Sequence, residues 1–205
     1  MKYIQTLKFS LFSLIIVGLS ACSSGSSLPG ITAPSAEDQV KGNYLSTISL
    51  IEYGDFQCPA CGYYAPMVQQ ISEEFGTKIN VVSRNFPLNQ IHKNAQITAQ
   101  AAEAAGEQGK FWEMHDKLFE TQKDWSESVN MQEVLVTYAT ELGLNIEQFN
   151  TDLQSAEIKT KIKNDYKSGV AAGVTGTPSY FLNGKKLDNP RSIEDFRAAV
   201  EAVLK

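Results

Sequence analysis

The amino-acid sequence predicts an α/β domain in which two mixed halves are separated by an inserted helical block. Two apolar, β-branched runs flank a helix-periodic stretch between residues 47 and 84. Helix formers then dominate from residue 92 to about residue 167, and strand signals return only near residue 179. A chain of 205 residues, 42% of them hydrophobic, is long enough for one domain that carries such an insertion.

The first half is predicted to be a β-α-β unit. Residues 47–53 form a buried strand that ends at Gly54, and residues 78–84 form a second strand. Between them we expect a helix over residues 59–75, because apolar side chains recur there at steps of three and four: Cys61, Tyr64, Val68, Ile71 and Phe75. A crossover of this kind pairs its two strands in parallel.

The middle of the chain is predicted to be helical over residues 95–105, 111–119, 131–142 and 146–166, with breaks at Gly106, Gly109 and Gly143. We interpret the alanine-rich first run as a closely packed helix. The second half then adds a strand at residues 179–182. Asn183-Gly184 predicts a hairpin to residues 185–187, and a last helix begins at Ser192, with Asp195 three residues later as in a capping pattern.

The N-terminus has the features of an export signal. Lys2 and Lys8 precede an apolar stretch of 11 residues, 9–19, which is too short to span a bilayer. Leu19-Ser-Ala-Cys22 resembles the bacterial lipobox, so we expect residues 1–21 to be removed and Cys22 to carry the lipid anchor. An ordinary secretory signal with an incidental cysteine is the alternative.

Domain boundaries follow from these patterns. Residues 22–43, rich in Ser, Gly and Pro, are predicted to be a flexible tether. Residues 44–91 and 169–205 form the two halves of the domain, and residues 92–168 form the insertion. The net charge of −5, spread without long single-sign runs, argues against nucleic acid as a partner.

Two of the three cysteines, Cys58 and Cys61, lie at the start of the first predicted helix. Pro59 suits the first helical position, which makes Cys58 the cap. Unpaired N–H groups and the helix dipole there stabilise a thiolate, so the pKa of Cys58 should lie below the usual value of about 8.5. Cys61 lies one turn further on the apolar stripe and should remain a neutral thiol. The pattern favours a reactive dithiol.

Two other interpretations of the cysteine pair stay open at this point. A structural zinc site would have to recruit His92 and His115, which are 23 residues apart, because the sequence has no second Cys-x-x-Cys. A purely structural disulfide is the other. A binding protein that holds a soft metal such as Cu(I) on Cys58 and Cys61 is a further possibility from a different functional class.

The motif Cys58-Pro-Ala-Cys61, with Pro66 in the following helix and Gly-Val-Thr-Gly-Thr177-Pro178-Ser-Tyr-Phe near the C-terminus, resembles the thioredoxin superfamily. The inserted helices make residues 44–205 similar to the DsbA-like thiol:disulfide oxidoreductases, and residues 84–88 and 109–119 resemble the BdbD-like branch. This resemblance implies a thioredoxin fold with an inserted helical subdomain.

The resemblance also implies roles for individual residues. Pro178 corresponds to the family's cis-proline beside the cysteine pair, and Thr177 offers backbone groups to a substrate strand. Glu52 matches the buried acid, which takes the proton of Cys61, although a strand-end glutamate that reaches solvent is the alternative. Pro66 is expected to kink the active-site helix.

The resemblance further implies an oxidase of the bacterial cell envelope that introduces disulfides into unfolded, cysteine-containing exported proteins. No metal or cofactor is expected, because the dithiol carries the electrons. A DsbB-like, quinone-linked membrane partner would recharge it. The dipeptide Pro59-Ala60 is expected to contact the substrate. The familiar DsbA form has a histidine in the second place of this dipeptide, whereas this sequence has Ala60, so one donor to the thiolate is missing. A reductase or isomerase fed by a membrane electron donor is the alternative.

Overall fold

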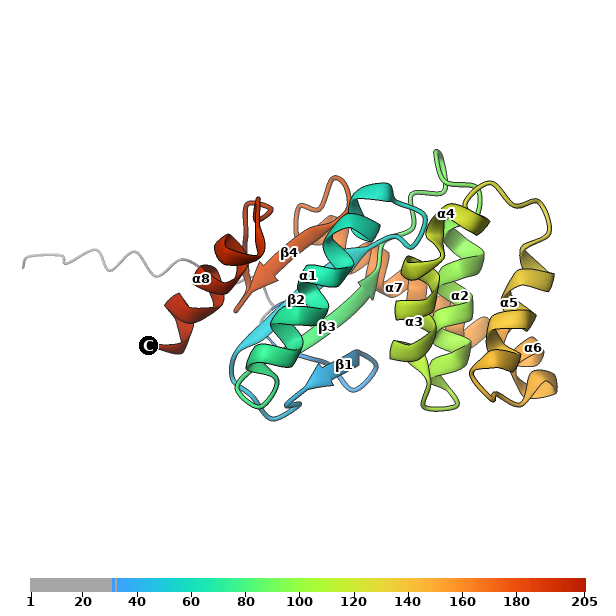
Figure 1. The fold of residues 1–205 in the computed structure, drawn as a ribbon, viewed down its shortest axis with the longest axis horizontal. Helices are drawn as coiled ribbons and strands as arrows, with labels where there is room; N and C mark the ends of the chain where they lie inside the picture. The colour runs from blue at the N-terminus through green and yellow to red at the C-terminus, as the bar shows by residue number, and fades with distance from the viewer. Residues whose placement is uncertain (1–30, 32) are drawn as a thin grey trace, which may run out of the picture.

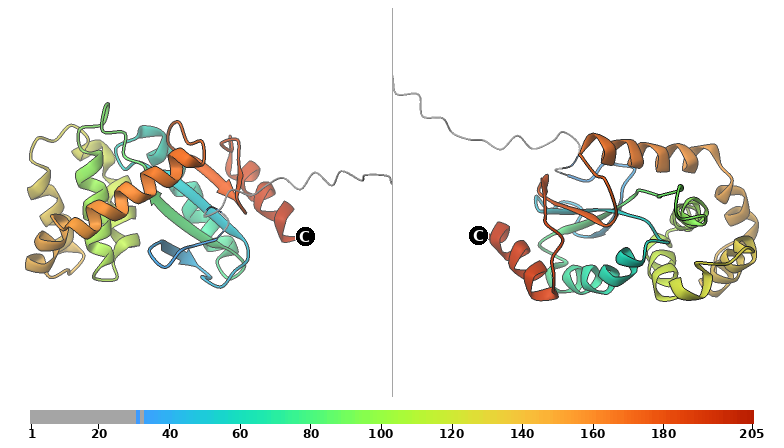
Figure 2. Two further views of the ribbon diagram at one scale, coloured as in Figure 1. Left: turned by 180° about the vertical axis from the view of Figure 1, so that it is seen from behind. Right: turned by 90° about the horizontal axis from the view of Figure 1, so that it is seen from above.

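The computed structural model describes Ile31 and residues 33–205 (Figure 1). In this part of the chain, five strands form one sheet in the order β1-β3-β2-β4-β5. Helices α1 and α8 cover one face of this sheet and α7 crosses the other, while the remaining helices pack beside it (Figure 2). The predicted α/β class with an inserted helical subdomain is therefore confirmed.

The first half of the domain has the predicted β-α-β topology. Strand β2 covers Ser49–Gly54, α1 covers Pro59–Phe75 and β3 covers Asn80–Asn85. Strands β2 and β3 pair in parallel, as expected for a crossover connection. All but the last residue of β2 is buried, which fits a central strand covered on both faces.

The second half contains the predicted hairpin and the predicted cap. Strand β4, Ser179–Leu182, pairs antiparallel with β2 and with the short strand β5, Lys185–Lys186. Asn183 and Gly184, with φ of 49° and 78°, form the connecting turn, which needs left-handed backbone at both positions. Helix α8, Ile193–Leu204, begins where Ser192 accepts a hydrogen bond from the backbone N–H of Asp195.

The inserted block contains six helices: α2 (Ala95–Gly106), α3 (Phe111–Glu120), α4 (Gln122–Trp125), α5 (Met131–Glu141), α6 (Ile146–Leu153) and α7 (Ala156–Ala171). The prediction of one helix over residues 146–166 is wrong. Helix α6 ends at Leu153, and Ser155 caps the next helix, because its side chain accepts a hydrogen bond from the N–H of Ile158. The short helix α4 was not predicted.

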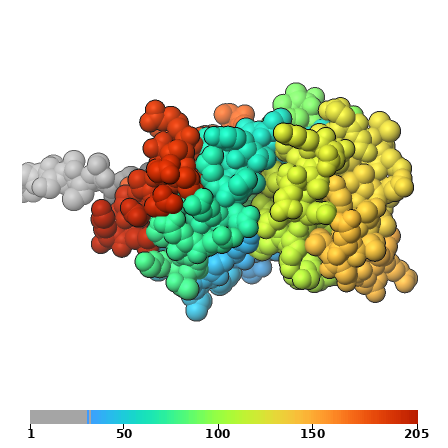
Figure 3. Space-filling model, in the orientation of Figure 1, coloured from blue at the N-terminus to red at the C-terminus, as the bar shows by residue number. Residues whose placement is uncertain are grey.

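The alanine-rich helix α2 lies at the centre of this block. Ala101, Ala102, Ala104 and Ala105 are completely buried, and α2 contacts α3, α5, α6 and α7. The predicted close packing is confirmed, since small side chains allow helices on several sides to approach. The space-filling view shows how α1 lies between this block and α8 (Figure 3).

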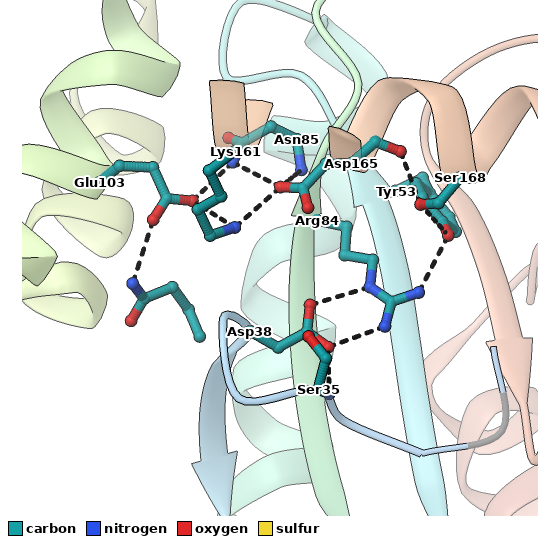
Figure 4. Close-up of polar contacts among 10 residues, drawn as sticks. Ser35, Asp38, Tyr53, Arg84, Asn85, Glu103, Lys161, Asp165 and Ser168 are labelled. Carbon is teal, nitrogen blue, oxygen red and sulfur yellow. Dashed lines mark hydrogen bonds and ion pairs between the residues drawn. The ribbon is translucent and has the colours of Figure 1, made fainter. Parts of the chain in front are cut away.

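The predicted flexible tether over residues 22–43 is wrong at its C-terminal end. Residues Gln39–Gly42 form strand β1, which pairs antiparallel with β3, so the domain begins before residue 44. Just ahead of this strand, both carboxylate oxygens of Asp38 pair with the buried guanidinium of Arg84, at 2.9 and 2.7 Å (Figure 4). A buried cation needs such a partner, and this holds the segment in place.

A second polar cluster in Figure 4 joins the inserted block to the sheet. Lys161 of α7 lies 2.9 Å from both Glu103 of α2 and Asp165 of α7. The side-chain amide of Asn85, at the end of β3, donates hydrogen bonds to both of these carboxylates. Because these groups are largely buried, the pairs fix how α2 and α7 lie against β3.

The predicted signal segment and Cys22 lie outside the described residues. Among the residues that are described, no helix is long and apolar enough to cross a bilayer.

Candidate active site

Cys58 occupies the position between β2 and α1 that the sequence predicts. Its backbone is extended, with φ of −69° and ψ of 121°, and Pro59 is the first residue of the helix. Cys58 is 7% exposed and its sulfur donates to the carbonyl oxygen of Thr177 at 3.4 Å, whereas Cys61 is completely buried. Both cysteines are free thiols in this structure.

The two thiols differ strongly in acidity. A hydrogen bond from Cys61 is the main cause that lowers the pKa of Cys58 to about 5; burial opposes it, and Thr177 and the backbone N–H groups of Cys61 and Ala60 add to it. Burial raises the pKa of Cys61 well above its usual value, and the nearby Glu52 raises it further. The directions of both shifts agree with the predicted division into a thiolate and a neutral thiol.

The Thr177-Pro178 peptide bond is cis, as the resemblance implies, and lies against the cysteines. The hydroxyl of Thr177 is buried and has no hydrogen-bond partner within the described part of the chain. Thr177 nevertheless lowers the pKa of Cys58. Its hydroxyl is therefore a donor that the Cys58 thiolate can use.

Glu52 lies beneath the pair on β2 and is 5% exposed. The alternative that its side chain reaches solvent is therefore wrong. Burial raises the pKa of Glu52 to about 7; Tyr180 opposes this shift, and the charge of Cys58 adds to it. Oε1 of Glu52 would lie 3.3 Å from a β-carbon on Gly54, so the carboxyl group turns toward the end of the strand.

Gln122 is a residue that the sequence analysis missed. From the inserted helix α4, its amide nitrogen donates hydrogen bonds to the carbonyls of Phe56 at 2.7 Å and Cys58 at 2.9 Å. This side chain fixes the loop that carries the first cysteine. The contact spans more than 60 residues of sequence, and the sequence offers no local pattern that indicates it.

A second set of contacts holds the same loop. The Asp55 carboxylate accepts hydrogen bonds from the N–H groups of Gln57 and Leu88 and lies 2.7 Å from Nδ1 of His92. The side chain of Gln57 reaches Asn94 and Ser126 in the inserted block. The loop before Cys58 is thus bound on both sides by the insertion.

The histidines considered as zinc ligands have other partners. His92 pairs with Asp55, and Nδ1 of His115 lies 2.8 Å from Asp116. Across Ile31 and residues 33–205, no three His, Cys, Asp or Glu side chains gather in a group that suits a metal ion.

The remaining predicted residues lie around the pair. Pro59 and Ala60 are exposed beside Cys58. Pro66 lies inside α1, where its missing N–H leaves the carbonyl of Gly62 without the usual helical donor.

This architecture defines a class: a thioredoxin-fold protein with a Cys-x-x-Cys pair at the start of α1 and helices inserted after β3. A comparison with protein-family models identifies the family to which the chain belongs. The family model described as Thioredoxin matches residues 35–202, and the chain belongs to that family.

Solved structures share the fold at low sequence identity. Wolbachia pipientis alpha-DsbA1 has a TM-score of 0.73 and 20% identity over 84% of this chain and 93% of that one. Oxidised BdbD from Bacillus subtilis has a TM-score of 0.72 and 22% identity over 84% and 96%. A thioredoxin-like oxidoreductase from Silicibacter pomeroyi has a TM-score of 0.71 and 24% identity over 82% and 93%. The DsbA-like resemblance is therefore confirmed at the level of the fold.

Curated relatives at higher identity are named as antiporters. Na(+)/H(+) antiporter NhaA 1 of Salinispora arenicola is 38% identical over 167 residues, which cover 82% of this chain and 25% of that protein. NhaA 1 of Mycolicibacterium vanbaalenii is 36% identical over 169 residues, 80% of this chain and 26% of that protein. The chain thus spans about a quarter of the length of these relatives.

Proposed function

We propose that this protein is a thiol:disulfide oxidoreductase that oxidises cysteine pairs in exported proteins. The observation that carries the proposal is the acidity of Cys58, whose pKa of about 5 contrasts with the raised pKa of Cys61. Such a pair has one sulfur that remains a thiolate at neutral pH and one that is protonated when it is released. The antiporter relatives match this chain over only about a quarter of their own length. We therefore propose for this chain only the chemistry that its own residues support.

The reaction proceeds by two exchanges at sulfur. A client thiolate attacks Cys58 of the Cys58-Cys61 disulfide, which forms a mixed disulfide and releases the Cys61 sulfur; that sulfur takes a proton. The client's second thiolate then attacks the client sulfur that is bonded to Cys58 in the mixed disulfide. This step releases Cys58 as a thiolate and leaves the client oxidised and the enzyme dithiol reduced.

The acidity of Cys58 favours oxidation of the client. A thiolate with a pKa of about 5, compared with about 7 in thioredoxin, stabilises the reduced enzyme by about 2.3 kcal/mol at pH 7. For a two-electron couple this corresponds to about 50 mV. From a thioredoxin potential of about −270 mV, the couple moves to about −220 mV.

We propose a setting for this reaction from the N-terminal sequence. Export through the signal at residues 1–21 and a lipid anchor on Cys22 would hold the enzyme at a membrane surface of the cell envelope, where client disulfides persist. The reduced dithiol then needs an electron acceptor in that membrane, and we propose a quinone-linked oxidase of the DsbB type.

The test is a single-turnover assay with oxidised protein and a reduced peptide that contains two cysteines. We expect one peptide disulfide for each protein chain and none with Cys58→Ser or Cys61→Ser, because neither variant can form the Cys58-Cys61 disulfide that accepts the electrons. Metal analysis of protein purified without chelator accompanies the assay. A stoichiometric metal that is lost in Cys58→Ser, with no peptide oxidation by the wild type, would show a metal-binding protein instead.

A further inference from the structure

The carboxyl group of Glu52 must exchange protons with solvent, although it is almost completely buried. In each cycle, Cys61 gains a proton when its sulfur is released and loses one when the disulfide forms again. Glu52 lies between β3 and β4 in the sheet, with Ser83 and Tyr180 as its neighbours across the strands. At 5% exposure, its side chain has almost no direct contact with water.

A small cavity borders Glu52. About 10 Å³ in it is available to the centre of a water molecule, which is enough space for one water. Its polar lining consists of Glu52, Asp55, Ser83, Asn85 and His115. A buried water requires two or more polar partners of this kind.

His115 connects this cavity to the surface. It belongs to α3 in the inserted block and is 6% exposed. Its Nδ1 lies 2.8 Å from Oδ1 of Asp116, and Nε2 has no hydrogen-bond partner among the described protein groups. The Asp116 side chain is 30% exposed, and its other oxygen lies 3.3 Å from Nζ of Lys41, which is similarly exposed. Because His115 lines the cavity and its partner Asp116 is partly exposed, polar groups lead from the cavity to the surface.

We propose that His115 carries protons between Glu52 and the surface carboxylate Asp116, through a water molecule in the cavity that it shares with Glu52. This proposal rests on the function proposed above. His115 is then a positioning residue for the reaction, because it acts on Glu52 and does not touch the substrate.

The protons balance over one cycle. When Cys61 loses its proton to the Glu52 carboxylate, the water accepts a proton from Glu52 and gives one to Nε2 of His115. The ring then releases its Nδ1 proton at Asp116, from which it passes to solvent. In the other half of the cycle, Cys61 takes a proton from Glu52, and one proton moves inward along the same groups, which restores the first tautomer of the ring.

The charges around the path are consistent with this role. Burial lowers the pKa of His115, as does the charge of Lys41, while Asp116 opposes both, so the ring is neutral at rest and can accept a proton. Cys58, Cys61, Asp55 and Tyr180 are the other ionisable groups that face Glu52.

Packing alone is the competing explanation for His115. Its ring contacts those of Phe56, Trp112 and Phe119, with centroids 5.5, 4.9 and 4.9 Å away. A phenylalanine at this position keeps the aromatic contacts and removes the proton-accepting nitrogens. The variant His115→Phe therefore separates the two roles.

The experiment follows the reduced protein as it reacts with dithiobis(nitrobenzoic acid). Cys58 attacks the reagent and releases a first coloured thiolate. Cys61 then attacks the mixed disulfide and releases a second, a step that requires its proton to reach Glu52. The first release serves as an internal control for Cys58 and for the fold, and Glu113→Gln on the same helix is the matched surface control.

In His115→Phe we expect an unchanged first release and a second release that splits into two phases. Molecules with an ionised Glu52 react at the wild-type rate, and molecules with a protonated Glu52 react about tenfold more slowly or worse. The slow fraction should be close to half at pH 7, because the pKa of Glu52 is about 7, and it should shrink at pH 8.

His115→Gln, which keeps a polar side chain without the titration, should give the same slow phase. A second release that stays single and as fast as in the wild type in both variants overturns the relay, while peptide oxidation by the wild type still supports the proposed function. A wild-type protein that shows neither the coloured releases nor peptide oxidation overturns both proposals.

Discussion

The side chain of Gln122 fills the space that a side chain on Gly62 would need. A β-carbon on Gly62 would lie 2.6 Å from Oε1 of Gln122, well inside van der Waals contact. Gly62 directly follows Cys61 in α1, and the same Gln122 amide binds the carbonyls of Phe56 and Cys58. Gln122 of the inserted block thus reaches the cysteine pair directly, in the space that the glycine leaves open.

Gln122→Ala should destabilise the reduced protein by about 1–3 kcal/mol, because it removes the side-chain donor to the Phe56 carbonyl and leaves the Cys58 carbonyl with the N–H of Gly62. Gly62→Ala should also be destabilising, because its methyl group meets the amide of Gln122. The two changes should interact. In the Gln122→Ala background, Gly62→Ala should lower the free energy of unfolding by much less than it does in the wild type. Urea unfolding of the single and double variants measures this coupling, and additive losses would contradict it.

Thr177→Val should raise the pKa of Cys58 by about one unit. The hydroxyl is available to donate to the thiolate and lowers its pKa. A hydrogen bond to a charged group contributes roughly 1.5–3 kcal/mol, and one pKa unit corresponds to about 1.4 kcal/mol. The pH dependence of alkylation of Cys58 gives the value. An unchanged midpoint would show that Cys61 and the backbone N–H groups stabilise the thiolate without this hydroxyl.

Glu52→Gln should stabilise the reduced protein at pH 8 and have little effect near pH 4. The pKa of Glu52 is raised from 4.5 to about 7, so the folded state binds more protons than the unfolded state between these values. Wild-type stability therefore falls as pH rises through this window, by about 3 kcal/mol in total for this group. Denaturant unfolding of both proteins at pH 4, 6 and 8 checks this; a constant difference would contradict it.

Asp38→Ala should lower the free energy of unfolding by about 3–5 kcal/mol, because it removes the carboxylate that pairs with the buried Arg84 guanidinium. Glu37→Gln is the matched control, since Glu37 is exposed beside it and should be within about 0.5 kcal/mol of the wild type. Thermal or urea unfolding compares the two. Equal stability would show that the ion pair between Asp38 and Arg84 adds nothing to the stability of the domain.

Features with a local cause were predictable from the sequence. Pro59 after Cys58 marks the helix start, Asn183-Gly184 marks the hairpin, and Ser192 marks the last cap; each acts within a few residues of chain. Much of the acidity of Cys58 has a local cause, because the Cys61 thiol, three residues further along, is the main group that lowers its pKa and the N–H groups of Cys61 and Ala60 add to it.

Features with a distant cause were not predictable. Strand β1 has few apolar residues, and it is held by pairing with β3 and by the bond between Asp38 and Arg84, 46 residues away. His115 has the sequence neighbourhood of an ordinary helix residue, and only the folded chain brings it to the cavity beside Glu52. The break at Ser155 is a local cap that helix-forming residues on both sides concealed.

The redox potential of the Cys58-Cys61 couple, measured at pH 7 against glutathione, tests the central proposal most directly. With the pKa of Cys58 near 5, we predict a potential of about −220 mV or less negative. A potential at or below the thioredoxin value of about −270 mV would contradict the oxidase and indicate a reductase.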